Sequence, residues 1–206
     1  MSVQKRFDVS LAAALLAALL ALAIVALVPS KANALGTFSG GVLTVDGGEG
    51  KIVPRCANDG EVTVSGVPVD NEPAFCRDLT QVVVIGSDSY DLFDFSYLPD
   101  DLGGGQGPIE LTAIGNGDSD KLIPALNHIN VFNGGKGSDA AVGGNLNDRL
   151  SGGPAGDKLD GAGGKDILKG GPGGDSLTGG PGRDILKGGP GGDGLSGGPG
   201  KDIEKP

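Results

Sequence analysis

Aromatic residues, cysteine and histidine are scarce in this sequence. Its 206 residues contain no Trp, two Tyr, six Phe, two Cys and one His. Two cysteines and one histidine cannot supply the four ligands of a structural zinc site, and a single histidine excludes the H-E-x-x-H motif of zinc proteases. So small an aromatic content does not describe the core of an ordinary globular enzyme. We therefore expect no enzymatic activity and no catalytic residue.

Positive charge is also short, because 16 Lys and Arg face 26 Asp and Glu, for a formal net charge of -10. This balance argues against a nucleic-acid partner. The glycine-rich segments lack the G-x-x-x-x-G-K-[ST] phosphate loop. Gly194 to Gly198 fits the G-x-S-x-G motif of hydrolases, but it lies in phase with a repeat and has no strand-to-helix turn. The one histidine, His128, is expected to be a surface or turn residue.

Glycine is abundant, with 41 residues, and most of it follows a strict period. Gly134 to Lys205 consists of eight consecutive nine-residue units: GGKGSDAAV, GGNLNDRLS, GGPAGDKLD, GAGGKDILK, GGPGGDSLT, GGPGRDILK, GGPGGDGLS and GGPGKDIEK. Position 8 is Leu in six units, with Ala141 in the first and Glu204 in the last. Position 6 is Asp in all eight: Asp139, Asp148, Asp157, Asp166, Asp175, Asp184, Asp193 and Asp202.

Each unit combines a tight loop with a minimal strand. Glycine reaches positive φ without steric cost, so the first six residues can turn sharply and aim backbone carbonyls at one point. The remaining three residues form a strand whose middle side chain points inward. The fourth, sixth and eighth units are more similar to one another than to the units next to them in the sequence. This similarity predicts that two units make one coil. The Asp residues then form two columns: Asp139, Asp157, Asp175, Asp193 and Asp148, Asp166, Asp184, Asp202.

These units resemble the calcium-binding nonapeptide repeat of RTX (haemolysin-type) proteins, G-G-x-G-x-D-x-U-x, which builds a parallel β-roll. The resemblance implies several Ca²⁺ ions held by the Asp carboxylates and by loop carbonyls. Leu146 and Ala155 replace the usual glycine at position 4, so we expect weak calcium binding or distorted loops there. With at most one inward-facing Leu in each unit, the repeats bury little apolar surface. The stacked carboxylates also repel one another. Folding and Ca²⁺ binding are therefore expected to be one event.

The first 80 residues divide into two parts. Residues 1–34 are predicted to be a secretion signal peptide, with Lys5 and Arg6 before an apolar run and an Ala-Asn-Ala cleavage site ending at Ala34. The apolar run, from Leu11 to Val28, is also just long enough for a membrane anchor if it is not cleaved. Residues 35–80 are predicted to be β-rich. In an exported protein Cys56 and Cys76 are expected to form a disulfide that closes a small hairpin.

Residues 81–133 show the repeat in a degraded form. Asp120 and Leu122 occupy positions 6 and 8 of one such unit, so Asp120 is a further candidate calcium ligand. Gly86 to Asp94 has Asp91 and Phe93 at the same positions, and Ala125 to Asn133 has Asn130 and Phe132 there. Residues 98–108 are expected to form an excursion loop. We predict that irregular coils begin near Gln81 and become regular in residues 134–206. The expected fold is all-β: a right-handed parallel β-roll or β-solenoid with an irregular β-rich N-terminal cap.

The sequence thus predicts a secreted, extracellular or cell-surface calcium-binding protein whose repeats fold outside the cell. Two alternatives remain. One is a cell-surface adhesin or a module that binds an envelope polymer, or a second roll, through an apolar ladder of Ile167, Ile185 and Ile203. The other is an accessory domain left from a secreted hydrolase. No contact with a membrane is expected except through an uncleaved signal segment.

Overall fold

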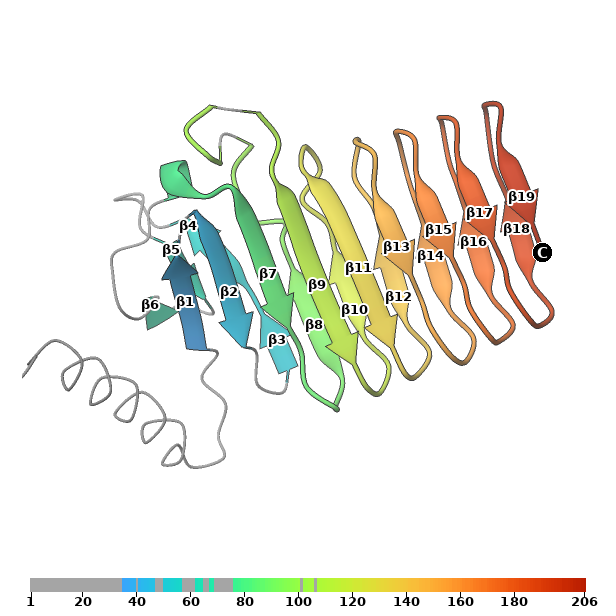
Figure 1. The fold of residues 1–206 in the computed structure, drawn as a ribbon, viewed down its shortest axis with the longest axis horizontal. Coiled ribbons are helices and arrows are strands. Elements are labelled where there is room, and N and C mark those ends of the chain that lie inside the picture. Colours follow the sequence, from blue (N-terminus) through green and yellow to red (C-terminus); the bar gives the residue numbers. More distant parts are fainter. Residues whose placement is uncertain are drawn as a thin grey trace, which may run out of the picture. The chain divides into compact units, whose positions relative to one another are not determined.

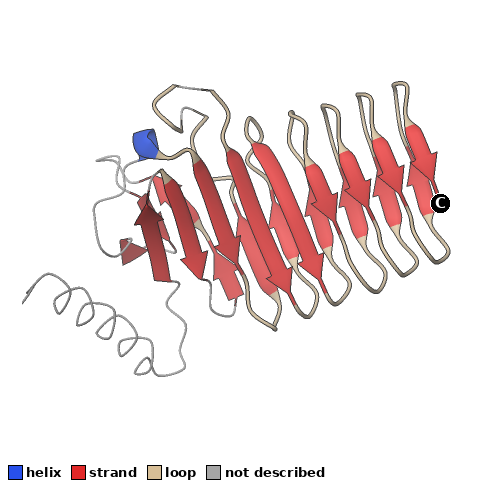
Figure 2. Cartoon of the chain, viewed as in Figure 1, coloured by secondary structure: helices blue, strands red, loops and turns tan. Residues whose placement is uncertain are grey.

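The computed structural model describes residues 35–39, 41–46, 50–56, 62–64, 67–68, 76–100, 102–105 and 107–206. The predicted signal peptide, residues 1–34, lies outside these residues. Among the residues that are described, no helix has the length and hydropathy needed to span a membrane. In this described part, strands make up nearly all of the regular structure (Figure 2), and the single short helix there is a 3-10 turn, η1 (Cys76–Asp78).

Two sheets of parallel strands form the body of the fold (Figure 1). Sheet A has nine strands in the order β1 (Leu35–Ser39), β2 (Val42–Asp46), β7 (Gln81–Ile85), β9 (Glu110–Asn116), β11 (Ile129–Gly135), β13 (Arg149–Ser151), β15 (Ile167–Lys169), β17 (Ile185–Lys187) and β19 (Ile203–Lys205). Sheet B has seven strands in the order β18 (Gly194–Ser196), β16 (Ser176–Thr178), β14 (Lys158–Asp160), β12 (Ala140–Val142), β10 (Lys121–Ile123), β8 (Asp91–Asp94) and β3 (Gly50–Ile52). Among the described strands of these two sheets, β1 alone runs antiparallel to its neighbour.

The chain alternates between the two sheets from β7 onward, so each pair of successive strands completes one coil. In the regular region the strand register shifts by eighteen residues: Leu150 pairs with Leu168 in sheet A, and Leu159 pairs with Leu177 in sheet B. The prediction that two units make one coil is therefore confirmed. The parallel two-sheet arrangement also confirms the predicted β-roll class.

The interior is a column of leucines that widens into aromatic packing upstream. Leucine side chains at position 8 are buried from Leu150 to Leu186. Phe93, Phe95 and Phe132 are among the largest buried side chains, and the rings of Phe93 and Phe132 meet edge to face with centroids 6.4 Å apart. All of the aromatic core thus precedes the regular units, which contain no aromatic residue.

The stack begins earlier than the sequence predicts. We expected the coils to start near Gln81, but β2 already pairs in parallel with β7, and β3 with β8. The inward side chains of β2, Leu43 and Val45, are fully buried. This coil has no Asp-x-Leu pattern and is separated from the next by the disulfide-bearing segment, so its sequence does not reveal that it belongs to the roll.

That inserted segment forms a third, antiparallel sheet of β4 (Pro54–Cys56), β5 (Val62–Val64) and β6 (Val67–Pro68). A disulfide joins Cys56 at the end of β4 to Cys76 at the start of η1. The predicted disulfide is confirmed. It fixes both ends of an excursion whose own strands are very short.

A second excursion joins β8 to β9, as the sequence predicts, and buried side chains hold it down. Leu98 and Leu102 pack into the core. His128 lies in a turn, as expected, but it is fully buried rather than on the surface. Its Nδ1 accepts a hydrogen bond from the Ile109 backbone N–H at 3.2 Å, so Nε2 carries the proton and donates to the Pro99 carbonyl at 2.9 Å. The histidine therefore clamps both ends of the excursion.

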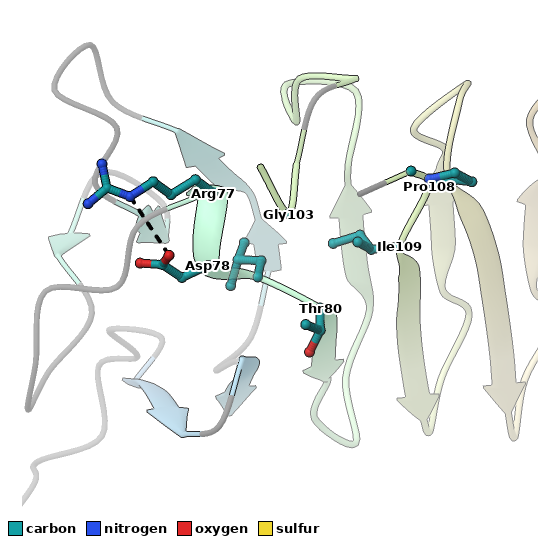
Figure 3. A pocket seen from close by; sticks show the side chains of 8 residues that line it. Arg77, Asp78, Thr80, Gly103, Pro108 and Ile109 are labelled. Carbon is teal, nitrogen blue, oxygen red and sulfur yellow. Dashed lines mark ion pairs between the residues drawn. The ribbon is translucent and has the colours of Figure 1, made fainter. Parts of the chain in front are cut away.

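A pocket of about 410 Å³ lies between η1 and this excursion (Figure 3). Its two charged lining residues form an ion pair with each other, Arg77 Nε lying 3.7 Å from Asp78 Oδ1. The remaining lining residues are apolar or small: Leu79, Thr80, Gly103, Gly107, Pro108 and Ile109.

Candidate metal centre

The Asp residues at position 6 lie where each loop enters a strand. Loops of one column lead from sheet A to sheet B and those of the other column lead back. Although aspartate is normally exposed, six of the eight are buried, with 0% to 3% of the residue accessible: Asp139, Asp148, Asp157, Asp166, Asp175 and Asp184. Burying carboxylates without partners is costly, so their hydrogen bonds decide what the loops can do.

One carboxylate oxygen of each Asp joins a continuous ladder. Asp157 Oδ1 accepts a hydrogen bond from the backbone N–H of Asp139 at 2.8 Å, one coil earlier. The same bond, between 2.7 and 3.0 Å, links Asp120 to Asp139, Asp148 to Asp166, Asp157 to Asp175, Asp166 to Asp184, Asp175 to Asp193 and Asp184 to Asp202. Oδ1 is thus used for stacking the coils.

The other oxygen, Oδ2, is buried and has no hydrogen-bond partner in seven loops: Asp120, Asp139, Asp157, Asp166, Asp175, Asp184 and Asp193. A buried acceptor without a donor costs about 1–3 kcal/mol, and more when it is charged. Seven such atoms in register are a feature of the repeat and not a local defect. When these carboxyl groups are ionised, a positively charged partner would stabilise them.

Glycine at position 1 leaves the space that such a partner would occupy. A methyl group placed on Gly161 would lie 2.5 Å from Asp166 Oδ2 and 2.7 Å from the Gly179 carbonyl oxygen. On Gly179 it would lie 2.6 Å from Asp184 Oδ2 and 2.6 Å from the Gly197 carbonyl oxygen. Each of these spaces is lined by a carboxylate oxygen and a carbonyl oxygen from successive coils. Hard oxygen ligands of this kind suit Ca²⁺, so the residues present fit the ion.

Burial raises the pKa of these carboxyl groups. Desolvation is the main cause for Asp157 and Asp166, whose pKa values rise to about 7 despite the hydrogen bonds from neighbouring backbone N–H groups. Asp120 behaves in the same way, with a pKa of about 7. Desolvation also raises the pKa of Asp139, Asp148 and Asp184. Without a cation the ionised form is therefore poorly stabilised.

Some loops satisfy Oδ2 internally. Asp148 Oδ2 accepts a hydrogen bond from the Gly144 backbone N–H at 2.5 Å. Asp91 Oδ2 accepts from the Ser87 N–H at 2.6 Å and from its hydroxyl at 3.1 Å. Asn130 takes the place of Asp in the column of Asp148. These loops share the repeat geometry but lack a free oxygen, a distinction that the sequence analysis missed.

Position 4 of the repeat is where Leu146 and Ala155 replace the usual glycine. Gly137 and Gly164 have φ of +107° and +124° there, and Ala155 keeps a left-handed φ of +87°. The expected distortion therefore takes the form of backbone strain at Ala155, because a residue with a side chain adopts a backbone conformation that favours glycine. Leu146 is not among the residues with positive φ.

Close stacking at position 4 gives a testable prediction. A methyl group on Gly191 would collide with the Gly173 carbonyl oxygen of the preceding coil, whereas one on the adjacent Gly192 would meet nothing within 4 Å. We expect Gly191→Ala to lower the stability of the last coils by about 1–3 kcal/mol, and Gly192→Ala to change it little. Thermal unfolding in saturating Ca²⁺ measures the difference, and equal melting temperatures would contradict the stacking geometry.

No group of three or more His, Cys, Asp or Glu side chains surrounds a single point among the described residues. A metal ion in these loops would therefore take one carboxylate from each loop and its other oxygen ligands from the backbone. This is the ligand set predicted from the repeat.

The chain was compared with protein families, curated proteins and solved structures. The model of the RTX calcium-binding nonapeptide repeat (4 copies) matches residues 133–168, 142–177 and 169–204. Neither the curated proteins nor the solved structures give a match. The matched segments contain the loops from Asp139 to Asp202 and do not include Asp120.

Proposed function

Because residues 133–204 are RTX calcium-binding nonapeptide repeats, we propose that this chain is a secreted calcium-binding protein whose roll folds as Ca²⁺ binds outside the cell. The observation that carries the proposal is the set of seven buried Oδ2 atoms without a partner, five in one column and two in the other. Bound calcium supplies the positive charge that these oxygens lack. Because they lie on successive coils, ions held between adjacent loops connect each coil to the next.

Calcium is the ion that suits these loops best. The oxygen-only lining excludes ions that prefer nitrogen or sulfur, and Ca²⁺ tolerates irregular coordination by six to eight oxygens better than Mg²⁺ does. In one column we assign Asp120, Asp139, Asp157, Asp175 and Asp193 as ligands. In the other we assign Asp166, Asp184 and Asp202. Asp148, whose Oδ2 already has a partner, is at most a weak ligand.

Two further observations support function outside the cell. RTX repeats are typical of secreted proteins, and the Cys56–Cys76 disulfide fits an oxidising compartment. The predicted signal peptide at residues 1–34 is consistent with this destination. Repeats that become ordered only in calcium-rich surroundings also stay unfolded until they leave the cell.

We also propose that the protein acts by binding and not by catalysis. Both ring nitrogens of His128 are used to hold the excursion, so this residue is structural. Ser196 of the G-x-S-x-G match ends strand β18 and is exposed. No strand-to-helix turn holds it, and no basic side chain of the described residues is bonded to it, although a nucleophilic serine requires both.

The experiment that tests the calcium sites is a count of bound ions in matched variants. We expect Asp166→Asn to remove calcium binding at its loop, because it replaces an unpartnered Oδ2. Asp148→Asn should leave the number of ions unchanged, because its Oδ2 is already bonded to Gly144. Isothermal titration calorimetry gives the stoichiometry, with circular dichroism to verify that each variant is folded in saturating Ca²⁺.

Asp120→Asn extends the same test beyond the matched repeats. Its Oδ2 is buried and unpartnered like those of the regular loops, so this substitution should also reduce the number of bound ions. Equal stoichiometry for the wild type, Asp120→Asn and Asp166→Asn would overturn the assignment of free Oδ2 atoms as calcium ligands.

A further inference from the structure

Six exposed cations lie in two rows at the last three strands of sheet A, one row within the strands and one in the loops that precede them. The strand register aligns Lys169 with Lys187 and Lys187 with Lys205. The second row consists of the residues at position 5, each directly before the Asp at position 6: Lys165, Arg183 and Lys201. Between the rows lie Ile167, Ile185 and Ile203, which are also in register. We call these six exposed residues the cationic face: Lys165, Lys169, Arg183, Lys187, Lys201 and Lys205.

No acidic side chain compensates the cationic face. Among the residues that the structure describes, none of the six forms an ion pair. The carboxylates of Asp166 and Asp184 are buried in the loops, and that of the half-buried Asp202 accepts a hydrogen bond from the Asp184 backbone N–H at 2.9 Å. Glu204 is the one acid within these strands, and its Oε1 accepts a hydrogen bond from the Gly197 backbone N–H at 2.6 Å. The positive charge of this surface is therefore unopposed, in a chain whose net charge is -10.

The opposite side of the same coils has no such charge. On sheet B, β16 and β18 present small neutral side chains outward: Ser176, Thr178, Gly194 and Ser196. The strand before them, β14, presents one cation and one anion, Lys158 and Asp160. The asymmetry follows from the eighteen-residue period, because the fourth, sixth and eighth units share a Lys or Arg at position 5 and a Lys at position 9.

Aligned cations do not help the roll to fold. Neighbouring strands are about 4.8 Å apart, and like charges placed opposite each other on adjacent strands are destabilising. Calcium in the loops cannot relieve this repulsion, because it is itself positive. A partner with negative charges repeated along a line would relieve it.

We propose that the cationic face binds an unbranched anionic polysaccharide lying along the stacking direction of the coils. Anionic groups repeated along the polymer match cations repeated from coil to coil. The isoleucine row offers an apolar floor for the C–H faces of sugar rings. Residues 134–206 contain no aromatic side chain on which nucleic-acid bases could stack. The proposal requires the folded roll and does not depend on which loops hold calcium.

The test measures binding of the full chain to dextran sulfate in saturating Ca²⁺, with uncharged dextran for comparison. The test variant carries Lys169→Gln, Lys187→Gln and Lys205→Gln. The control variant loses the same number of charges elsewhere, by Lys121→Gln, Lys136→Gln and Lys158→Gln. We expect the wild type to bind dextran sulfate and not uncharged dextran, with a Kd for dextran sulfate that rises with salt concentration.

The test variant loses three cations that would face the anionic polymer, so it should bind on the order of 100-fold more weakly. The control variant should bind almost as well as the wild type. An equal loss of affinity in both variants would show that binding depends only on net charge, and would overturn the proposal. So would equally tight binding to phosphatidylglycerol vesicles or single-stranded DNA, or dimerisation that Ile167→Thr, Ile185→Thr and Ile203→Thr together abolish. Circular dichroism of the same samples separates failure to bind from failure of calcium to fold the roll.

Discussion

Removing calcium is expected to unfold residues 134–206 while the upstream coils stay folded. The regular units bury at most one leucine per strand and no aromatic residue, so their core is thin. In the calcium-free roll the unpartnered Oδ2 atoms of successive loops remain buried and repel one another. Both effects disfavour the ordered state at neutral pH, and calcium reverses the second.

The upstream part has stabilising features that do not involve calcium. Phe93, Phe95 and Phe132 fill its interior, His128 clamps the second excursion, and a disulfide closes the first. Removing calcium should leave this part protected, with some loosening near Asp120, whose Oδ2 is unpartnered.

Hydrogen exchange read by mass spectrometry, in Ca²⁺ and then in EDTA, measures both regions in one sample. Amides of β13 to β19 should exchange at least 100-fold faster in EDTA, which corresponds to about 2.7 kcal/mol of lost protection. Amides of β7, β9 and β11 should change far less. Unchanged protection of β13 to β19 would mean that the leucine column alone stabilises the roll, and would refute coupled folding.

Much of this architecture could be predicted from the sequence because the residues that determine it recur at a fixed spacing. The spacing of Asp and Leu predicts which residues face the loops and which face the core, and the similarity of every second unit predicts the two-sheet coil. Asp120 and Leu122 carry the same signal upstream, and the structure places them in the same columns as the regular units. The disulfide could be predicted because Cys56 has only one possible partner.

The rest depends on contacts that no period encodes. Leu43 and Val45 alternate like any half-buried strand, so nothing in their sequence indicates that β2 joins a stack whose next strand is β7. Whether an Oδ2 is free depends on one backbone N–H: Gly144 donates to Asp148, while the equivalent oxygen of Asp166 has no donor. His128 is buried because a loop distant in sequence folds over it.

Acid is expected to replace calcium in part. Burial raises the pKa of Asp157 and Asp166 to about 7, from an ordinary value near 3.8. A carboxyl group whose pKa is higher in the folded chain favours folding while it is protonated. That contribution is fully present below about pH 3.8 and is lost as the pH rises through about 7. In EDTA the β-type circular dichroism of the roll should therefore be strong near pH 4 and weak above pH 7.

Calcium binding should have the opposite pH dependence, because the ion must displace these protons. Its apparent affinity should fall as the pH drops below about 7, and calcium binding at pH 6 should release protons into the buffer. Calorimetry in buffers of different ionisation enthalpy measures that release. A calcium-free roll that becomes less ordered on acidification would contradict the raised pKa values.

Asparagine separates charge from shape in the same loops. Asp157→Asn with Asp166→Asn keeps the size of both side chains and the acceptor that joins each ladder, but neither residue can ionise. In EDTA at pH 7 this variant should be more ordered than the wild type and should depend less on pH, because two buried charges are gone. In saturating Ca²⁺ it should be less stable than the wild type, because two ligands are gone. Opposite effects in the two solutions would identify these carboxylates as the calcium ligands, whereas destabilisation in both would assign them a purely structural role.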